Sequence, residues 1–172
     1  MLDIQQAKDR VLAKVFSKSP WLFNQWVRLS TFAEFNDSPW NELTKPINEC
    51  RLALVTTGGV HLKSQVSFDM KDPAGDPTFR EILADTRPSD LSITHNYYDH
   101  SDAEKDINIV LPIERVRTLE SSGDIGDVNH RHFSFMGHIR DCHLPTLVTE
   151  TAPGVADMLK ADGVDIAILT PA

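Results

Sequence analysis

The chain lacks several features that mark common classes of protein. Its 172 residues include only two cysteines, Cys50 and Cys142, which form neither a Cys-x-x-Cys pair nor a disulfide framework. No apolar run approaches the roughly 20 residues of a membrane-spanning helix. The N-terminus has no basic segment followed by an apolar one, so it does not read as a secretory signal. These absences favour a cytoplasmic protein without a membrane partner.

Positive charge is also scarce. The 17 Lys and Arg residues are outnumbered by 25 Asp and Glu residues, which gives a net charge of −8 and leaves no basic stripe. Nucleic-acid binding requires such a stripe, so we expect no nucleic-acid partner. The chain also lacks a G-x-G-x-x-G fingerprint and the lysine of a phosphate-binding loop.

The N-terminal 45 residues differ from the rest of the chain. Residues 3–16 place apolar side chains at helical spacing, which predicts an amphipathic helix. An aromatic-rich stretch follows, and its irregular spacing favours packing over a base-stacking platform. Its members are Trp21, Phe23, Trp26, Phe32, Phe35 and Trp40. We therefore predict an arm over residues 1–45 and a separate domain over residues 46–172.

The pattern of the second region predicts an α/β domain. Residues 51–56 form a short continuous apolar run, as expected of a strand buried on both faces of a parallel sheet. Residues 63–88 contain four Pro and Gly residues and little periodicity, which predicts a long loop. The later elements are a strand over 91–94, an apolar run over 107–111, helices over 112–121 and 153–161, and a strand over 164–171. This alternation predicts a doubly wound α/β fold with a mostly parallel sheet.

The helix ends in this domain carry local signals. Pro112 suits the first turn of one helix, and Gly123 is expected to end it. Thr151 is expected to cap the next helix and Gly163 to end it.

Two glycines follow the first predicted strand, in the segment 56–61. Gly58 and Gly59 would let the backbone approach a ligand and present N–H groups to an anion. A tight turn that has only a structural role is the alternative interpretation.

Histidines are concentrated in two segments. In residues 94–102, His95, Asp99 and His100 could ligate a metal, or one histidine could transfer protons. A polar turn with aspartate caps is the alternative. In residues 129–138, a strand would place His130, His132, Ser134 and His138 on one face, which could line a pocket. Five of the seven histidines lie in these two segments, and this concentration favours an active site.

Several of these segments resemble one protein family. The chain resembles the selenoprotein B subunits of the glycine, sarcosine and betaine reductases and of the related D-proline reductase. The resemblance runs from about residue 38 onward. The matching stretches are residues 54–62, 68–69, 76–80, 94–102 and 106–110, Pro112 with its helix, and residues 133–138.

The resemblance implies a reductive cleavage of a C–N bond in a small amine or amino acid. In the family, a terminal strand like residues 164–171 is followed by a catalytic selenocysteine or cysteine, and further strands complete the sheet. We therefore expect a sheet that lacks its C-terminal strands, and a selenocysteine at the position after Ala172. The boundary would then record a UGA codon read as a stop; a shortened paralogue is the alternative. The resemblance also implies a pyruvoyl-bearing partner subunit and a thiol or dithiol electron donor. An exposed sheet edge would favour a homo-oligomer.

Site roles follow from the resemblance and from residue chemistry. The expected catalytic residues are His95, Tyr98, Asp99, His100 and His138, and the expected substrate-binding residues are Gly58, Gly59, His61, His132 and Ser134. The sequence itself requires no cofactor and assigns no metal ligand. Two other functions stay open: a binding module without a nucleophile, and a metal-dependent hydrolase that uses the histidine clusters.

Overall fold

The computed structural model describes residues 4–29 and 41–172, which belong to two compact units. The first unit contains the N-terminal helices and residues 96–99. The second unit contains residues 45–95 and 100–172. No helix in the described ranges is long and apolar enough to cross a membrane.

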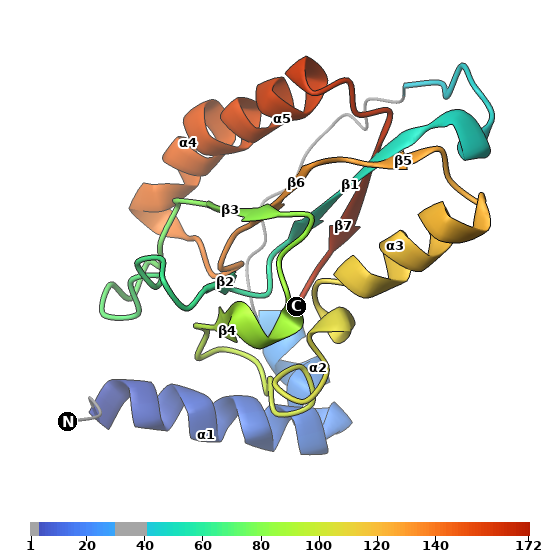
Figure 1. Ribbon diagram of the computed structural model, residues 1–172. Helices are drawn as coiled ribbons and strands as arrows, with labels where there is room; N and C mark the ends of the chain where they lie inside the picture. The colour runs from blue at the N-terminus through green and yellow to red at the C-terminus, as the bar shows by residue number, and fades with distance from the viewer. Residues whose placement is uncertain (1–3, 30–40) are drawn as a thin grey trace. The chain divides into compact units, whose positions relative to one another are not determined.

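The first unit is built on two helices (Figure 1), α1 (Ile4–Lys18) and α2 (Pro20–Leu29). Helix α1 confirms the predicted amphipathic helix. Helix α2 was not predicted, because its aromatic residues do not follow one clear helical stripe. The ring of Trp26 lies 5.9 Å from that of Phe16 and 6.0 Å from that of Phe23, so these aromatics pack together as expected. Phe32, Phe35 and Trp40 lie outside the described residues.

The second unit contains a mixed, mostly parallel sheet. Its central strand is β1 (Arg51–Thr56), as predicted. Strands β5 (Asp127–Val128) and β6 (Arg131–Ser134) pair with the two ends of β1, and β7 (Ile166–Thr170) pairs with residues 52–56; all three are parallel to β1. A strand can pair on two sides only, and β7 pairs with residues of β1 that also pair with β5 or β6. Strand β7 therefore lies on one side of β1, and β5 and β6 lie on the other. Strand β3 (Arg80–Leu83) is antiparallel to β6.

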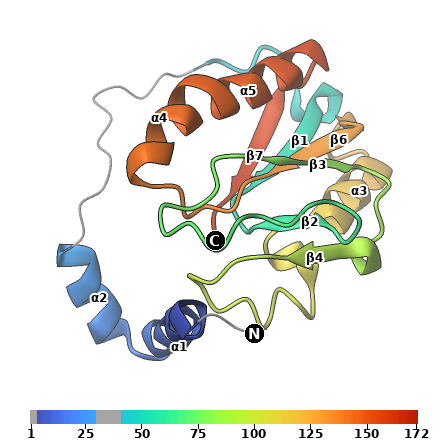
Figure 2. The same cartoon turned by 90° about the vertical axis from the view of Figure 1, so that its left-hand side faces the viewer.

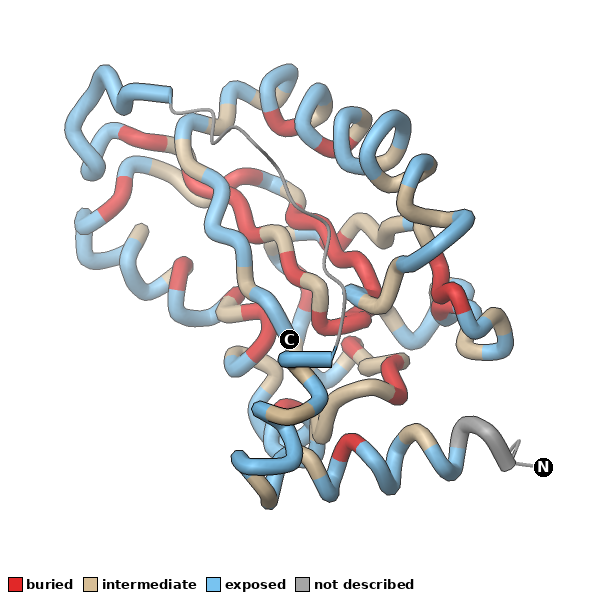
Figure 3. The backbone as a smooth tube through the Cα atoms, turned by 180° about the vertical axis from the view of Figure 1, so that it is seen from behind, coloured by how far each residue is buried: buried red, intermediate tan, exposed pale blue. Residues whose placement is uncertain are grey.

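Helices cover both faces of this sheet, which confirms the α/β class. Helix α5 (Ala152–Ala161) buries Val155 and Leu159 against Ala53, Phe133 and Phe135. Helix α3 (Ile113–Ser122) lies on the other face (Figure 2). The buried residues accordingly concentrate in the strands between the helices (Figure 3). Gly123 and Gly163 end the two helices at φ +78° and +73°, as predicted.

Strand β7 is only partly covered. Its residues Ala167, Ile168 and Leu169 are exposed, and the Leu169 side chain reaches 72% exposure although the strand is apolar. Within the described sheet β7 pairs on one side only, with β1. It is thus an edge strand with an apolar surface.

The cap predicted at Thr151 is wrong. A continuous helical segment runs through the 3-10 turn Asp141–His143, α4 (Leu144–Thr146) and the π turn Leu147–Thr151 into α5. The backbone of Thr151 is helical (φ −76°, ψ −41°), and its side chain makes no capping hydrogen bond. Pro153 supplies the physical reason for the π turn, because proline has no N–H and its ring crowds the carbonyl group four residues earlier.

Three other segments have structure that the prediction did not specify. The predicted loop over 63–88 contains β3, which the alternation of apolar and polar residues did not reveal. The predicted strand near 91–94 exists as β4 (Leu91–Ile93), but it pairs antiparallel with β2 (Val60–Leu62) in a separate two-stranded sheet. The apolar run at 107–111 forms a 3-10 turn (Ile107–Ile109) because Asp106 caps it by accepting a hydrogen bond from the Asn108 N–H. Further 3-10 turns occupy Ile47–Glu49 and Pro88–Asp90.

Candidate functional site

The connections of the sheet single out one point at the carboxyl ends of its strands, and we use the word crevice for that point. From β1 the chain passes through α3 to β6 on one side of β1, and from β6 through α5 to β7 on the other side. In open α/β sheets, ligands bind at the carboxyl ends of the strands where the connections diverge in this way. That point lies between the ends of β1 and β7, next to residues 57–59 and residues 170–172.

The turn after β1 is held tightly by backbone hydrogen bonds. The N–H of Gly58 donates to the Thr56 hydroxyl oxygen (3.0 Å), and the N–H of Gly59 donates to the Phe135 carbonyl (2.9 Å). Gly59 has φ +68°, and a β-carbon there would collide with the Thr94 carbonyl, so the position requires glycine. Both N–H groups bond within the protein. A carboxylate cradle formed by them stays a prediction, and it would have to compete with these bonds.

Three predicted catalytic histidines come together beside this turn. His95 is 4% exposed, and its β-carbon would lie 3.4 Å from a β-carbon at Gly59. Burial, and to a smaller extent nearby His138 and His100, lower the pKa of His95 to about 4, although a hydrogen bond to the Met136 carbonyl opposes them. His95 is therefore neutral at pH 7.

The two neighbouring histidines are anchored by separate contacts. Nε2 of His100 lies 3.0 Å from the His95 carbonyl oxygen, and Nδ1 lies 2.8 Å from the carboxylate of Glu104. Nε2 of His138 lies 3.0 Å from the carbonyl oxygen of Pro73. The cluster thus draws its members from two segments that lie about 40 residues apart in the sequence.

Tyr98 and Asp99 belong to the first unit, whereas the three histidines belong to the second. Both residues are half-buried. Within the first unit, Nε of Arg10 donates a 2.8 Å hydrogen bond to Oδ1 of Asn96. This contact ties the segment 96–99 to helix α1.

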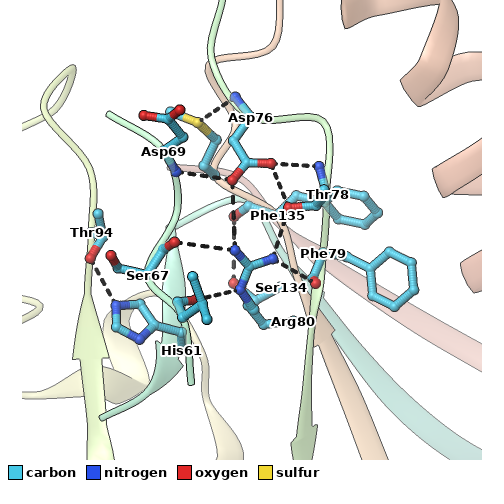
Figure 4. Close-up of polar contacts among 12 residues, drawn as sticks. His61, Ser67, Asp69, Asp76, Thr78, Phe79, Arg80, Thr94, Ser134 and Phe135 are labelled. Atoms are coloured by element: carbon cyan, nitrogen blue, oxygen red, sulfur yellow. Dashed lines mark hydrogen bonds and ion pairs between the residues drawn. The ribbon is translucent and has the colours of Figure 1, made fainter. Parts of the chain in front are cut away.

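His61 is fixed by two contacts, of which Figure 4 shows the one to Thr94. Its Nδ1 lies 2.8 Å from the Leu62 carbonyl oxygen and its Nε2 lies 2.8 Å from the Thr94 hydroxyl, which joins β2 to the end of β4. The ring is 5% exposed and packs edge-on against Phe68. Both ring nitrogens are thus engaged within the fold, and a substrate contact for His61 stays a prediction.

The structure also reveals an anchor that the site prediction omitted. The buried carboxylate of Asp76 accepts hydrogen bonds from the N–H groups of Asp69 (3.0 Å) and Thr78 (2.8 Å) and from the Thr78 hydroxyl, and it faces Arg80 at 3.6 Å (Figure 4). Burial alone would raise the pKa of Asp76, but these bonds and the Arg80 charge outweigh it and lower the pKa. The guanidinium of Arg80 lies 4.3 Å from the centre of the Phe68 ring. The motif at 76–80 was visible in the sequence, and the structure shows that its Asp76 holds together residues 69, 78 and 80.

His132 and Ser134 lie inside the sheet, and both are 0% exposed. Nδ1 of His132 accepts a 3.2 Å hydrogen bond from the Leu54 N–H, so the ring proton of the neutral form lies on Nε2. Burial lowers the pKa of His132 to about 4, with smaller contributions from Arg117 and His130. The hydroxyl of Ser134 lies 3.4 Å from the Phe135 carbonyl oxygen. The structure therefore places these two predicted substrate-binding residues in the core, and a substrate contact for either stays a prediction.

Neither cysteine lies at the crevice. Cys50 is fully buried just before β1, where its thiol faces the Pro46 carbonyl oxygen at 3.2 Å, and Cys142 is exposed in the 3-10 turn Asp141–His143. Across residues 4–29 and 41–172, no three His, Cys, Asp or Glu side chains are arranged to hold a metal ion.

Comparisons with known proteins agree on one family. The family model for the glycine/sarcosine/betaine reductase selenoprotein B matches residues 23–172. The chain is 38% identical over 131 residues to the D-proline reductase subunit gamma of Acetoanaerobium sticklandii, covering 76% of this chain and 52% of that protein. It is 30% identical over 148 residues to the glycine reductase complex component B subunit gamma of Carboxydothermus hydrogenoformans, covering 79% and 31%.

The chain thus spans about half of one relative's length and about a third of the other's. No solved structure matches it. The extent of the family match and the identity to the curated relatives settle the assignment: the chain belongs to the glycine/sarcosine/betaine reductase selenoprotein B family.

Proposed function

We propose that this chain forms part of a selenol- or thiol-dependent reductase that cleaves the C–N bond of a small amine or amino acid. The observation that carries the proposal is the cluster of His95, His100 and His138, which lies beside the turn after the central strand in a chain of this family. A relative named for D-proline reduction and others named for glycine reduction support the reaction class.

The nucleophile of the proposed reaction is a selenolate or thiolate directly after the terminal strand, as the resemblance implies. It attacks the carbon that bears nitrogen, and the electrons of the broken C–N bond leave with the amine, which takes up a proton. Two electrons from a dithiol then release the product with a new C–H bond and regenerate the nucleophile, and the dithiol becomes a disulfide. A thiol of ordinary pKa (about 8.5) is mostly protonated at pH 7, whereas a selenol is ionised, so a selenolate needs no general base.

The proposed roles of the side chains follow from their surroundings. His95 is neutral, so it would orient a reacting group through a hydrogen bond, and His138 would protonate the departing amine. Tyr98, Asp99 and His100 would complete proton delivery. The turn of Gly58 and Gly59, with His61, would face the substrate carboxylate, and His132 and Ser134 would support the strand behind it.

The proposal includes partners. A pyruvoyl-bearing subunit would activate the amine, and a thiol or dithiol protein or small molecule would supply electrons, in the cytoplasm. The relatives named as subunits support an assembly of several chains. The exposed apolar edge of β7 supports association, including self-association into a homo-oligomer.

The deciding experiment is the intact mass and elemental content of the protein from its native host, together with turnover of glycine, sarcosine, betaine and D-proline with a dithiol. A mass above 19.3 kDa with one selenium per chain, and release of the amine, would support the proposal. A native mass of 19.3 kDa, with ligand binding but no turnover, would favour the binding-module function. Stoichiometric zinc or iron with hydrolytic activity would favour the metal-dependent hydrolase.

A further inference from the structure

We infer that Thr57, which the sequence did not single out, is a positioning residue that fixes the carboxyl end of β7 at the crevice. This inference rests on the proposed function, because it concerns the geometry of that same site. Thr57 is half-buried and directly follows β1 at the point where the connections of the sheet diverge.

Two hydrogen bonds join Thr57 to the last residue of β7 and to the chain after it. The N–H of Thr57 donates to the Thr170 carbonyl (3.1 Å), and the hydroxyl oxygen of Thr57 accepts from the N–H of Ala172 (3.1 Å). The first bond extends the ladder between the two parallel strands. The second bond is made by a side chain, so it depends on the identity of residue 57.

The other side of Thr57 is closed by the chain that follows β6. A β-carbon at Gly137 would lie 2.7 Å from the Thr57 carbonyl oxygen and 3.1 Å from the Thr57 β-carbon, and Gly137 itself has φ +78°. Glycine at position 137 thus lets the chain after β6 pass close to Thr57, where a side chain would collide with it. Thr57 is therefore held between the ends of β6 and β7.

The neighbouring hydroxyls hold Thr170, the last residue of β7, but they do not bond Ala172. The hydroxyl of Thr56 is fully buried and faces the Gly58 N–H and the Thr170 carbonyl. The hydroxyl of Thr170 donates to the Val110 carbonyl (2.7 Å). Within residues 41–172, the Thr57 hydroxyl is the side-chain group that bonds the N–H of Ala172. A reacting group carried just after β7 would thus take its position from Thr57.

The test compares Thr57→Val, Thr57→Ser and wild type in the complete reductase purified with its native partners. Valine keeps the branched shape and removes the oxygen, whereas serine keeps the oxygen. Thr118→Val is the matched control, because the Thr118 hydroxyl bonds only the Glu114 carbonyl on α3, at 2.9 Å. The measurements are kcat, KM and hydrogen exchange at the Ala172 amide.

A displacement of about 1 Å at a reacting group lowers rates by roughly 100-fold. We expect Thr57→Val to lower kcat by about 10- to 100-fold with little change in KM, and Thr57→Ser to keep most of the wild-type kcat. The Ala172 amide should exchange faster only in the valine variant. Equal kcat in wild type and Thr57→Val would overturn the inference. If the wild type cleaves none of the candidate amines, the proposed function fails instead. The exchange measurement still decides whether Thr57 holds Ala172. Unchanged exchange of the Ala172 amide in Thr57→Val would show that Thr57 does not hold this residue.

Discussion

Lowering the pH from 8 to 5 should destabilise the protein through two buried histidines, His95 and His132. Both have a pKa of about 4 in the folded protein, below the value of 6.5 for an exposed histidine. Between these two pH values the unfolded chain binds protons that the folded chain cannot. The stability that these histidines contribute is therefore complete above pH 6.5 and is lost as the pH falls toward 4.

The magnitude follows from the same values. For one histidine with pKa 6.5 unfolded and about 4 folded, the linkage relation gives a loss of about 2 kcal/mol at pH 5. The two sites together contribute about 4 kcal/mol. That loss is a large part of the roughly 5–15 kcal/mol by which domains are usually stable.

The substitution His132→Asn isolates one of the two contributions. The amide oxygen of asparagine can accept the hydrogen bond from the Leu54 N–H that Nδ1 of His132 now accepts, yet it does not titrate. Urea unfolding at pH 8 and pH 5 gives the change in the free energy of unfolding for each protein. The difference between wild type and variant in that change is the quantity of interest, because any constant effect of the substitution cancels.

We expect His132→Asn to lose about 2 kcal/mol less than wild type between pH 8 and pH 5. The control is Thr118→Asn, because Thr118 is exposed on α3 and neither residue titrates, so the pH dependence of this variant should match that of wild type. Equal pH dependence in His132→Asn and wild type would refute the assignment of a buried, neutral His132.

Three further predictions concern the supports of the site. Asp76→Asn removes the charge from a carboxylate with several hydrogen bonds, so it should lower the free energy of unfolding by about 2 kcal/mol. Asp69→Asn, at an exposed position, should change that free energy by less than about 0.5 kcal/mol. Urea unfolding measures both. Gly59→Ala should destabilise the protein by about 2 kcal/mol and Gly123→Ala by about 1 kcal/mol. Both glycines have positive φ, but of the two only position 59 would also bring the new β-carbon against backbone atoms. Equal losses of stability would contradict this steric argument. If the protein self-associates through the edge of β7, Leu169→Lys should shift it toward monomer in sedimentation velocity, since a charge on an edge strand opposes strand pairing. An unchanged distribution would contradict self-association through β7.

Local signals in the sequence predicted the elements that depend on local physics. The run at 51–56 and the glycines at 123 and 163 behave as expected, because burial on both faces and positive φ each leave a clear mark on residue type. Strand β3 escaped prediction because edge strands are half-exposed and its four residues show no full alternation. The π turn also escaped, since Thr151 has the residue type of a cap.

The candidate site was predictable in part, for a related reason. Histidine density indicated His95, His100 and His138, and the fold brings these three together from segments about 40 residues apart. The same criterion also selected His132, whose surroundings are those of a core residue. Thr57 gave no signal, because a threonine after a strand is common. Its significance depends on the contacts with Gly137 and Ala172, which only the tertiary structure brings together.

The state of His95 bears on which chemistry this site can support. A neutral, buried imidazole cannot supply a proton readily at pH 7, since protonating it requires a pH near 4. Such a group would be a poor general acid for hydrolysis. A nucleophile that is already ionised needs no base, so its neighbour need only orient it or the substrate. The departing amine still requires a proton, and the less buried His138 at the margin of the cluster is better placed to pass one from solvent. The surroundings of the cluster therefore fit a selenolate or thiolate displacement better than a reaction that depends on His95 as acid.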